Sequence, residues 1–232
     1  MAGQDIEIKG VDGAFGGYLA TPASGSGPGL VVIQEIFGVN QVMRQITEMY
    51  ADAGYVALCP DLFWRQQPGI QITDQSKEEW DQAFALYQGF DVDKGIADID
   101  ATITTLRNMD GCTGKVGSTG YCLGGLLAYL TACRTSAEAS VGYYGVGIEG
   151  RLGEAQNMNG FCMLHIAEED GFCPKEAQAQ IRDDFDKSLK VTVHTYPGMD
   201  HAFCRYGGEH FDQENCDLAN RRTLDFFKQH LG

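Results

Sequence analysis

The chain has 232 residues, of which 44% are hydrophobic, so it can bury a sizeable core and is not a disordered protein. Seventeen basic and 32 acidic side chains give it a formal charge of −15. Because so acidic a surface repels phosphate backbones and anionic lipids, we expect no nucleic-acid or membrane partner, and an anionic ligand would need a local basic group.

The first strands are predicted near the N-terminus. Residues 5–22 alternate loosely between apolar and polar side chains around a turn at residues 11–13, which indicates an antiparallel hairpin. Residues 29–34 form a continuous apolar run, typical of a strand buried on both faces. Asn40 can then cap a helix that runs to about Ala53.

The rest of the chain alternates between strands and helices. Further strands are predicted at residues 54–60, 115–121, 139–145, 161–167 and 190–196. Helices are predicted at residues 74–89, 92–108 (capped by Asp91), 126–135, 174–189 (with Pro174 at its start) and 213–230. This alternation favours a largely parallel sheet with helices on both faces. Because the sequence contains no internal repeat and no linker, we expect residues 1–232 to form a single α/β domain.

The cysteines and the N-terminus indicate a compartment. The eight cysteines include no C-x-x-C pair and no framework spacing, and most fall in apolar runs, where a reduced cysteine behaves as a small hydrophobic residue. The sequence also has no apolar run of membrane-spanning length and no signal-peptide pattern. We therefore expect a cytoplasmic protein in which all but one of the cysteines are structural or incidental.

The exception is Cys122, in the sequence Gly120-Tyr121-Cys122-Leu123-Gly124. This G-x-C-x-G pattern lies between a predicted strand and a predicted helix, which is the setting of a nucleophile elbow with cysteine where serine commonly sits. Glycines at its first and fifth positions let strand and helix approach closely and let the turn adopt a strained conformation. Taken alone, the pattern fits equally well a glycine-rich loop around a buried cysteine.

Three further polar residues follow the ends of predicted strands, where reactive groups of α/β sheets gather. They are Glu35, Asp170 and His201. In an α/β-hydrolase triad the nucleophile comes first in the chain, then the acid, then the histidine. Cys122, Asp170 and His201 follow this order. The Cys122 thiolate would attack a carbonyl carbon, His201 would take and return the proton, and Asp170 would hold the imidazole tautomer.

An oxyanion hole is predicted from the backbone. The N–H groups of Leu123, directly after the nucleophile, and of Ile36, after the first long strand, would bind the oxyanion. Asp170 beside Gly171 also fits an ordinary turn residue, and His165, inside an apolar strand, is expected to be a core histidine. The sequence has no metal-ligand spacing and no phosphate-binding glycine loop, so we expect no metal and no cofactor.

The chain resembles the dienelactone hydrolases (carboxymethylenebutenolidases). The resemblance rests on residues 34–38 (Gln-Glu-Ile-Phe-Gly), 120–125 (Gly-Tyr-Cys-Leu-Gly-Gly) and 141–145 (Val-Gly-Tyr-Tyr-Gly), together with the loops of Asp170 and His201. It implies an α/β-hydrolase fold and cleavage of an unsaturated lactone to maleylacetate by a Cys-Asp-His triad without metal. It also implies that Glu35 hydrogen-bonds Cys122 at rest and takes part in activating the thiol, which is mostly protonated at neutral pH when unperturbed.

The sequence departs from this family where the substrate is chosen. The family holds the carboxylate of dienelactone with two arginines and a tyrosine; Arg205 matches one arginine, whereas Trp80 and Phe84 stand at the other two positions. Losing one charge-assisted contact removes roughly 1.5–3 kcal/mol of anchoring. Trp80 and Phe84 could line a pocket for an apolar acyl group or simply pack their helix onto the core. Arg65 is a further candidate for the missing charge.

We therefore expect a cysteine-dependent hydrolase that opens an unsaturated lactone or related ester through an acyl-thioester intermediate. One alternative is a broader carboxylesterase or thioesterase with the same triad. Another, from a different class, is a non-catalytic thiol- or redox-responsive or ligand-binding protein on the same fold. The expected partner is a small-molecule lactone or ester, and the expected state is a monomer or a weak homo-oligomer.

Overall fold

The computed structural model describes residues 3–232. The contacts between residues divide the chain into two compact units, and the boundary lies between Gly117 and Ser118. The central strand β5 (Cys112–Tyr121) begins in the first unit and ends in the second. The expectation of a single domain over residues 1–232 stays a prediction.

The first unit contains the predicted hairpin and two buried parallel strands. β1 (Gln4–Lys9) pairs antiparallel with β2 (Ala14–Ala20), and β2 pairs antiparallel with β4 (Val56–Pro60). β3 (Gly27–Ile33) runs parallel to β4, and nearly all of its residues are buried. The uninterrupted apolar runs predicted at residues 29–34 and 54–60 are therefore the two strands covered on both faces.

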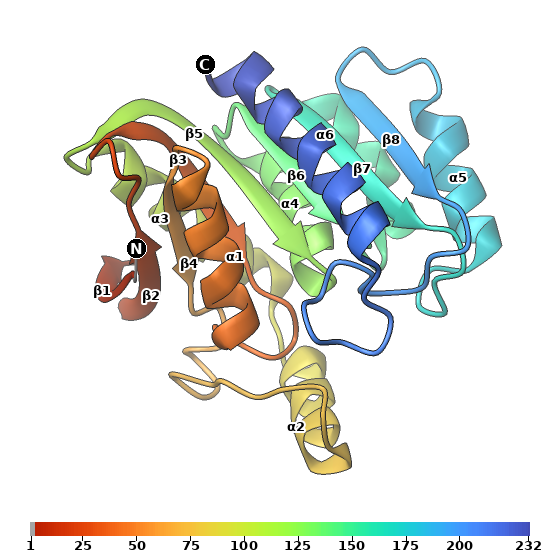
Figure 1. Cartoon of the computed structure of the whole chain (residues 1–232), viewed down its shortest axis with the longest axis horizontal. Helices are drawn as coiled ribbons and strands as arrows, with labels where there is room; N and C mark the ends of the chain where they lie inside the picture. The colour runs from red at the N-terminus through yellow and green to blue at the C-terminus, as the bar shows by residue number, and fades with distance from the viewer. Residues whose placement is uncertain (1–2) are drawn as a thin grey trace. The chain divides into compact units, whose positions relative to one another are not determined.

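Helices α1 (Gln41–Asp52) and α3 (Val92–Arg107) cover opposite faces of this part of the sheet, while α2 (Lys77–Gln88) projects beyond the strand ends (Figure 1). The predicted caps are confirmed. The Asn40 side chain accepts a hydrogen bond from the Met43 N–H at 3.1 Å, and Asp91 caps α3 in the same manner. These local bonds satisfy backbone donors that a helix leaves unpaired at its first turn.

The second unit contains only parallel pairs. β6 (Ala139–Tyr143) lies between β5 and β7 (Phe161–Ala167), and β8 (Val191–Tyr196) lies beyond β7. The register aligns Tyr121, Tyr143, His165 and His194 in one row across these strands. Neighbouring rings in this row lie 4.6, 4.4 and 5.8 Å apart between centroids.

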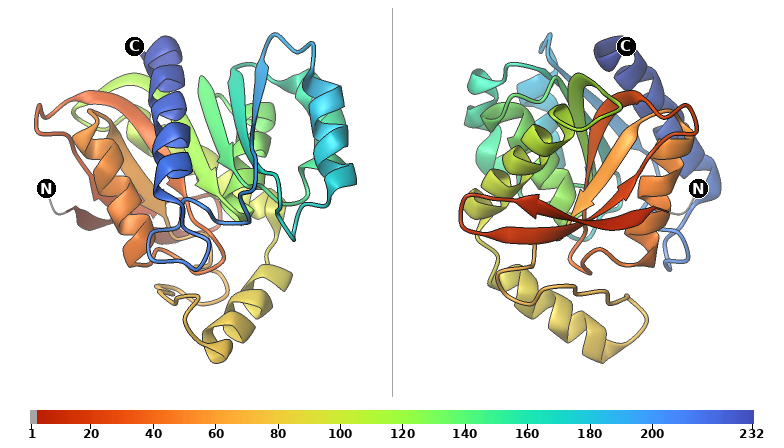
Figure 2. Two further views of the ribbon diagram at one scale, coloured as in Figure 1. Left: turned by 45° about the vertical axis from the view of Figure 1, so that its right-hand side comes forward. Right: turned by 90° about the vertical axis from the view of Figure 1, so that its left-hand side faces the viewer.

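Helix α6 (Gln213–Leu231) covers one face of these strands, and α4 (Leu123–Arg134) with α5 (Lys175–Phe185) covers the other (Figure 2). α4 is buried over almost its whole length, as its apolar sequence requires. The 3₁₀ helix η1 (Ile148–Asn157) is not predicted from the sequence, because it is polar and lacks an apolar period.

His165 is a core histidine, as predicted. Its Nε2 lies 2.9 Å from Thr223 Oγ1 and its Nδ1 lies 2.7 Å from the Tyr196 hydroxyl, so both ring nitrogens are hydrogen-bonded. The Tyr143 hydroxyl lies 2.6 Å from the same Thr223 oxygen. Complete burial, with smaller contributions from His194 and Arg222, holds the pKa of His165 well below its ordinary value. The ring is therefore neutral in the folded protein.

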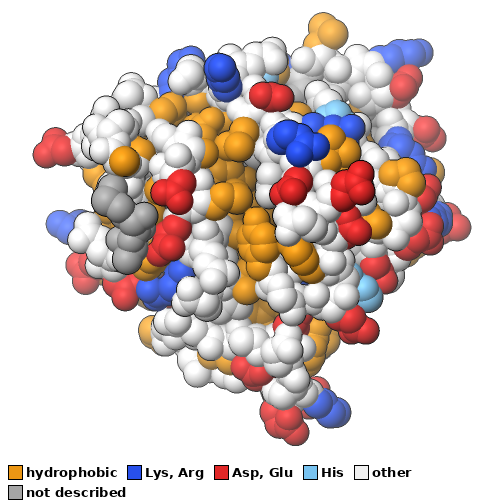
Figure 3. All heavy atoms as spheres, in the orientation of Figure 1, with side chains coloured by type: hydrophobic (Ala, Val, Ile, Leu, Met, Phe, Trp, Pro, Cys, Tyr) orange, Lys and Arg blue, Asp and Glu red, His pale blue; other side chains and the backbone are white. Residues whose placement is uncertain are grey.

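Acidic side chains are spread over the face shown in Figure 3, as the net charge of −15 leads one to expect. Among residues 3–232, no helix combines the length and the apolar character that a membrane crossing demands.

The cap of α1 leads to a stability prediction. Asn40→Ala removes the bond to the Met43 N–H and a second bond from Asn40 Nδ2 to the Ile72 carbonyl, so the free energy of unfolding in urea should fall by about 1–2 kcal/mol. Gln41→Ala, at the exposed neighbouring position, is the matched control and should change it by less than about 0.5 kcal/mol. Equal effects of the two substitutions would contradict this role of Asn40.

Candidate active site

Cys122 lies in a strained turn between β5 and α4. Its φ of 57° and ψ of −116° are unusual for a residue with a side chain. Its N–H donates to the Tyr143 carbonyl at 3.1 Å, and its carbonyl accepts from the Gly125 N–H at 2.9 Å. The helix begins at Leu123 and not at the predicted residue 126, so Cys122 itself is the N-cap residue. Its side chain is half-buried, unlike that of a cysteine packed in a core.

The glycines around Cys122 have a steric reason. A Cβ atom on Gly120 would lie 2.0 Å from the Gly124 carbonyl oxygen. A Cβ atom on Gly125 would lie 2.5 Å from the Tyr143 carbonyl oxygen and 2.8 Å from the Gly145 Cα. Strand β5, helix α4 and the end of β6 therefore approach more closely than any side chain at these positions allows. The glycine pattern read from the sequence is the pattern this packing demands.

Asp170 and His201 are hydrogen-bonded to each other. Asp170 Oδ2 lies 2.9 Å from His201 Nδ1, and their side chains are 1% and 7% exposed. Asp170 Oδ1 accepts a further bond from the Phe172 N–H at 2.8 Å. The carboxylate thus closes its own turn, as the simpler interpretation expected, and also binds the imidazole. Since a carboxylate only accepts, His201 Nδ1 carries the proton and Nε2 is left for other chemistry.

His201 also interacts with Cys122, so the second unit brings all three residues of the predicted triad together. Burial on its own would lower the pKa of His201. The charge of Cys122, hydrogen bonds to Asp170 and Cys122, and the charge of Asp170 outweigh it and raise that pKa to about 10. The imidazole of His201 is therefore protonated at neutral pH.

Two aromatic residues that the sequence analysis did not assign to the site hold His201 in place. The ring of Phe172 packs edge-on against the imidazole with centroids 4.8 Å apart, and Tyr144 does so at 5.2 Å. Phe172 is 49% exposed, so it covers the histidine on the solvent side. Its position two residues after Asp170 was the one sequence signal that could have indicated it.

Arg205 lies in the turn that follows His201, within the same unit. Its N–H donates to the Ala202 carbonyl at 2.8 Å, and Ala202 has a positive φ of 65°. Arg205 is 7% exposed, so the turn buries most of its side chain. The turn between His201 and α6 therefore keeps this arginine close in sequence and in space to the predicted triad histidine.

Glu35 and Ile36 belong to the first unit and follow Gln34, the residue after the end of β3. Both are buried, and the side chain of the preceding Gln34 fixes this segment, because its carbonyl accepts from the Leu62 N–H at 3.0 Å. Its amide also donates to the Glu35 carbonyl at 3.4 Å. The segment is thus anchored from the loop that follows β4, which restricts its backbone.

Trp80 and Phe84 form an aromatic pair on α2. Their rings stack with centroids 5.4 Å apart, and Trp80 also meets the edge of Phe37 at 5.1 Å. The Trp80 Nε1–H donates to the Asp74 carbonyl at 3.0 Å. Phe84 is 38% exposed, so packing onto a core does not account for it fully. The pair packs against Phe37, which follows Glu35 and Ile36 in the chain.

Arg65 does not offer the missing positive charge. Its guanidinium binds both carboxylate oxygens of the buried Asp98, at 2.5 and 2.9 Å, and Asp12 at 3.0 Å. It also lies over the Trp64 ring, 4.4 Å from the centroid. Two carboxylates therefore neutralise this arginine within the first unit, and the suggestion that it anchors a substrate is wrong.

The sequence is similar to those of known proteins over nearly its whole length. The sequence model described as the dienelactone hydrolase family matches residues 15–231. The chain belongs to the dienelactone hydrolase family. It is 49% identical to a protein of Azospirillum brasilense provisionally named a carboxymethylenebutenolidase, over 98% of this chain and 99% of that protein. It is 38% identical to the carboxymethylenebutenolidase of Pseudomonas putida, over 97% and 96%.

A solved structure supports the fold. A protein of Klebsiella pneumoniae, provisionally named a dienelactone hydrolase, is similar with a TM-score of 0.84 at 23% identity, covering 99% of this chain and 100% of that one. The predicted α/β-hydrolase fold, with a mostly parallel central sheet, helices on both faces and an N-terminal antiparallel hairpin, is confirmed. Membership of this family makes the chain a hydrolase of the dienelactone hydrolase type.

The environment of His201 leads to a pH prediction. By ¹H–¹⁵N NMR of the imidazole, His201 should stay protonated through neutral pH and lose its proton near pH 10. Cys122→Ser removes the thiol whose interaction with His201 raises this pKa, so the proton should leave at lower pH in the variant. Cys112→Ser, at the other half-buried cysteine, is the control and should leave the titration unchanged. A titration near pH 6.5 in both the native protein and the Cys122 variant would contradict this arrangement.

Proposed function

We propose that the protein hydrolyses small lactones or esters by cysteine-dependent acyl transfer. The observation that carries this proposal is the hydrogen bond between His201 Nδ1 and Asp170, together with the interaction of His201 with Cys122. A histidine oriented by a buried carboxylate and placed beside a thiol is the arrangement that activates a nucleophile. Membership of the dienelactone hydrolase family supports the same reaction class.

In the first half-reaction the Cys122 thiolate attacks the carbonyl carbon and the carbonyl oxygen takes the electron pair. The Leu123 N–H, at the positive end of helix α4, is proposed to stabilise that oxyanion together with the Ile36 N–H. The tetrahedral intermediate collapses to a thioester as the carbon–oxygen bond to the leaving group breaks. His201 gives its Nε2 proton to the leaving oxygen, which in a lactone stays attached to the product.

In the second half-reaction a water molecule attacks the thioester carbon. His201 takes a proton from the water, and the carbon–sulfur bond breaks to release the carboxylic acid and restore the thiolate. Asp170 holds the same imidazole tautomer through both halves and stabilises the imidazolium. The proposed steps use only these side chains, the backbone N–H groups and water.

Glu35 is proposed to act on the thiol and not on the substrate. The resemblance of residues 34–38 to the family motif implies that its carboxylate hydrogen-bonds the Cys122 thiol and accepts its proton when substrate arrives. A carboxylate can act in this way because an unperturbed thiol is mostly protonated at neutral pH. The buried, anchored position of Glu35 shortly after β3 supports the proposal.

The proposed substrate is a lactone or ester less anionic than dienelactone. Relatives named carboxymethylenebutenolidases support a dienelactone-type lactone, and Arg205 is proposed to bind its carboxylate. Only one of the family's two arginines is matched, however, and the stacked, partly exposed Trp80 and Phe84 offer an apolar surface. These aromatic residues favour the second candidate function, a broader carboxylesterase with the same triad.

A thiol-responsive or purely ligand-binding protein remains the alternative from another class. Such a protein has no use for a carboxylate that fixes a histidine tautomer, so the Asp170–His201 bond supports the enzyme. Fast labelling of Cys122 by iodoacetamide in a protein without esterase activity would favour the alternative. We further propose that the enzyme works in the cytoplasm as a monomer or a weak homo-oligomer.

The nucleophile is tested by Cys122→Ala, which should reduce hydrolysis of p-nitrophenyl acetate and of dienelactone to background while leaving the fold intact, as judged by circular dichroism. Cys112→Ala is the matched control, because the two thiols are similarly half-buried and Cys112 lies at the start of β5, away from the elbow. The control should keep its activity. Undiminished turnover by Cys122→Ala would overturn the proposed nucleophile.

Substrate choice is tested by Trp80→Arg, which restores the second arginine expected of the family. The ratio of kcat/KM for dienelactone to that for p-nitrophenyl acetate should rise by about 10-fold or more, because one charge-assisted contact is worth roughly 1.5–3 kcal/mol. Trp80→Gln is the control for loss of the indole and should not raise this ratio. An unchanged ratio in Trp80→Arg would show that position 80 does not contact the carboxylate.

A further inference from the structure

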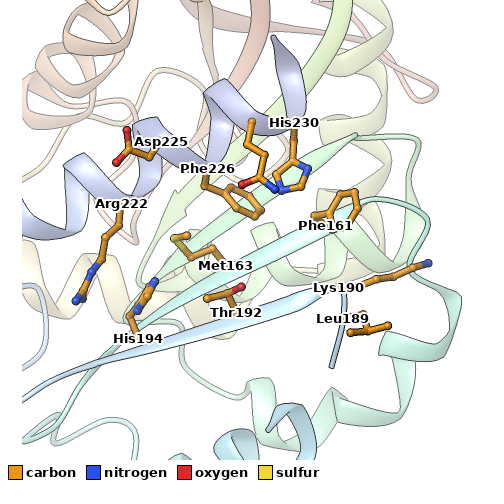
Figure 4. Close-up of a pocket in the computed structure, with 11 residues that line it drawn as sticks. Phe161, Met163, Leu189, Lys190, Thr192, His194, Arg222, Asp225, Phe226 and His230 are labelled. Atoms are coloured by element: carbon orange, nitrogen blue, oxygen red, sulfur yellow. The ribbon is translucent and has the colours of Figure 1, made fainter. Parts of the chain in front are cut away.

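The second unit contains a groove of about 360 Å³ between helix α6 and the strands β7 and β8. Its side chains come from the first half of β7, from β8 and the residues just before it, and from the C-terminal half of α6 (Figure 4). Cys122, Asp170 and His201 follow the opposite, carboxyl ends of β5, β7 and β8. The groove therefore lies apart from the proposed active site, and its volume falls in the range of small-molecule sites.

One end of the groove is cationic. Arg222 of α6 and His194 of β8 line it side by side, and Asp225, one turn further along α6, directs its carboxylate away from the guanidinium (Figure 4). Arg222 lies over the Tyr196 ring, 5.4 Å from its centroid, and makes no ion pair among the described residues. On a chain with a charge of −15, a positive end with no carboxylate bound to it is unusual.

His194 responds to this charge. Burial lowers the pKa of His194, and the neighbouring Arg222 lowers it further. The other charged and titratable groups around it are the neutral His165, stacked at 5.8 Å, and Asp225 and Lys190 on the groove lining. An anion bound against Arg222 would stabilise the protonated form of His194, so this ring can report on occupancy.

The other end of the groove is aromatic. Phe161 stacks on His230 with centroids 4.1 Å apart, and His230 meets Phe226 at 4.6 Å. Phe161, the first residue of β7, is 38% exposed, and Met163 contributes an apolar side chain to the groove lining. Between the two ends, the Thr192 hydroxyl points into the groove and can donate a hydrogen bond (Figure 4).

We propose that this groove is a second binding site, for a small aromatic monocarboxylate. The carboxylate would bind the Arg222 guanidinium, with Thr192 as a further donor, because arginine offers planar paired donors for this group. The aromatic body would lie on the wall formed by Phe161, Phe226 and His230. The groove thus supplies the local basic group that an anionic ligand needs on this acidic protein.

The site also adjoins a chain of buried hydrogen bonds. Arg222 lies over the Tyr196 ring, the Tyr196 hydroxyl binds His165, and His165 reaches the Tyr143 hydroxyl through Thr223. The Tyr143 carbonyl in turn accepts the N–H of Cys122. An anion at Arg222 therefore touches a network that ends at the elbow, which is a physical route from the groove to the nucleophile's backbone.

The test is a titration of the full-length protein with benzoate, followed by the NMR signals of the His194 ring. Saturable binding should raise the pKa of His194, whereas benzamide, the neutral analogue, should not. Arg222→Gln should weaken benzoate binding by at least about 10-fold, and Arg222→Lys should restore part of it. Arg221→Gln is the control, because it removes the same charge from an exposed position on α6 outside the groove.

A second variant separates the two ends of the groove. Phe161→Ala shortens the aromatic wall, so it should weaken benzoate binding while leaving the response of His194 to saturating benzoate intact. Thermal unfolding checks that each variant is folded. A pKa of His194 that does not respond to benzoate, or a response equal in native protein and Arg222→Gln, would overturn the proposal.

Discussion

The close contact between the backbones of β5, α4 and the end of β6 is the constraint on which the proposed chemistry depends. Because glycines stand where any side chain would collide, the turn at Cys122 can be strained and its N–H can bond the Tyr143 carbonyl. This contact fixes Cys122 at the start of a helix, where the first N–H groups are not used within the helix. In general, the N-terminal end of a helix favours negative charge.

The two units carry different parts of the proposed function. The second unit contains the histidine, the carboxylate hydrogen-bonded to it and the thiol that interacts with it, and these groups keep the imidazole protonated. The first unit contains Glu35, Ile36 and the aromatic pair of Trp80 and Phe84. The residues proposed for bond cleavage thus belong to the second unit, whereas those proposed for thiol activation and substrate choice belong to the first.

The sequence could predict features that depend on neighbouring residues or on a continuous apolar run. The caps at Asn40 and Asp91 depend on neighbouring residues, and Asp170 and His201 follow strands whose apolar runs are unmistakable. Other features depend on contacts between residues far apart in the chain. Arg65 is neutralised by Asp98, 33 residues away, and Phe172 covers His201 only after the two loops meet. The groove of α6, β7 and β8 likewise exists only in the folded chain.

The buried His165 and the triad histidine have opposite effects on the stability of the fold. His165 stays neutral when folded but takes a proton when unfolded, so its contribution falls as pH drops below about 6.5. The pKa of His201 is instead raised to about 10, so its contribution is complete below about 6.5 and disappears as pH rises to about 10. Together, these two imidazoles favour a maximum of folding stability in mildly acidic to neutral solution.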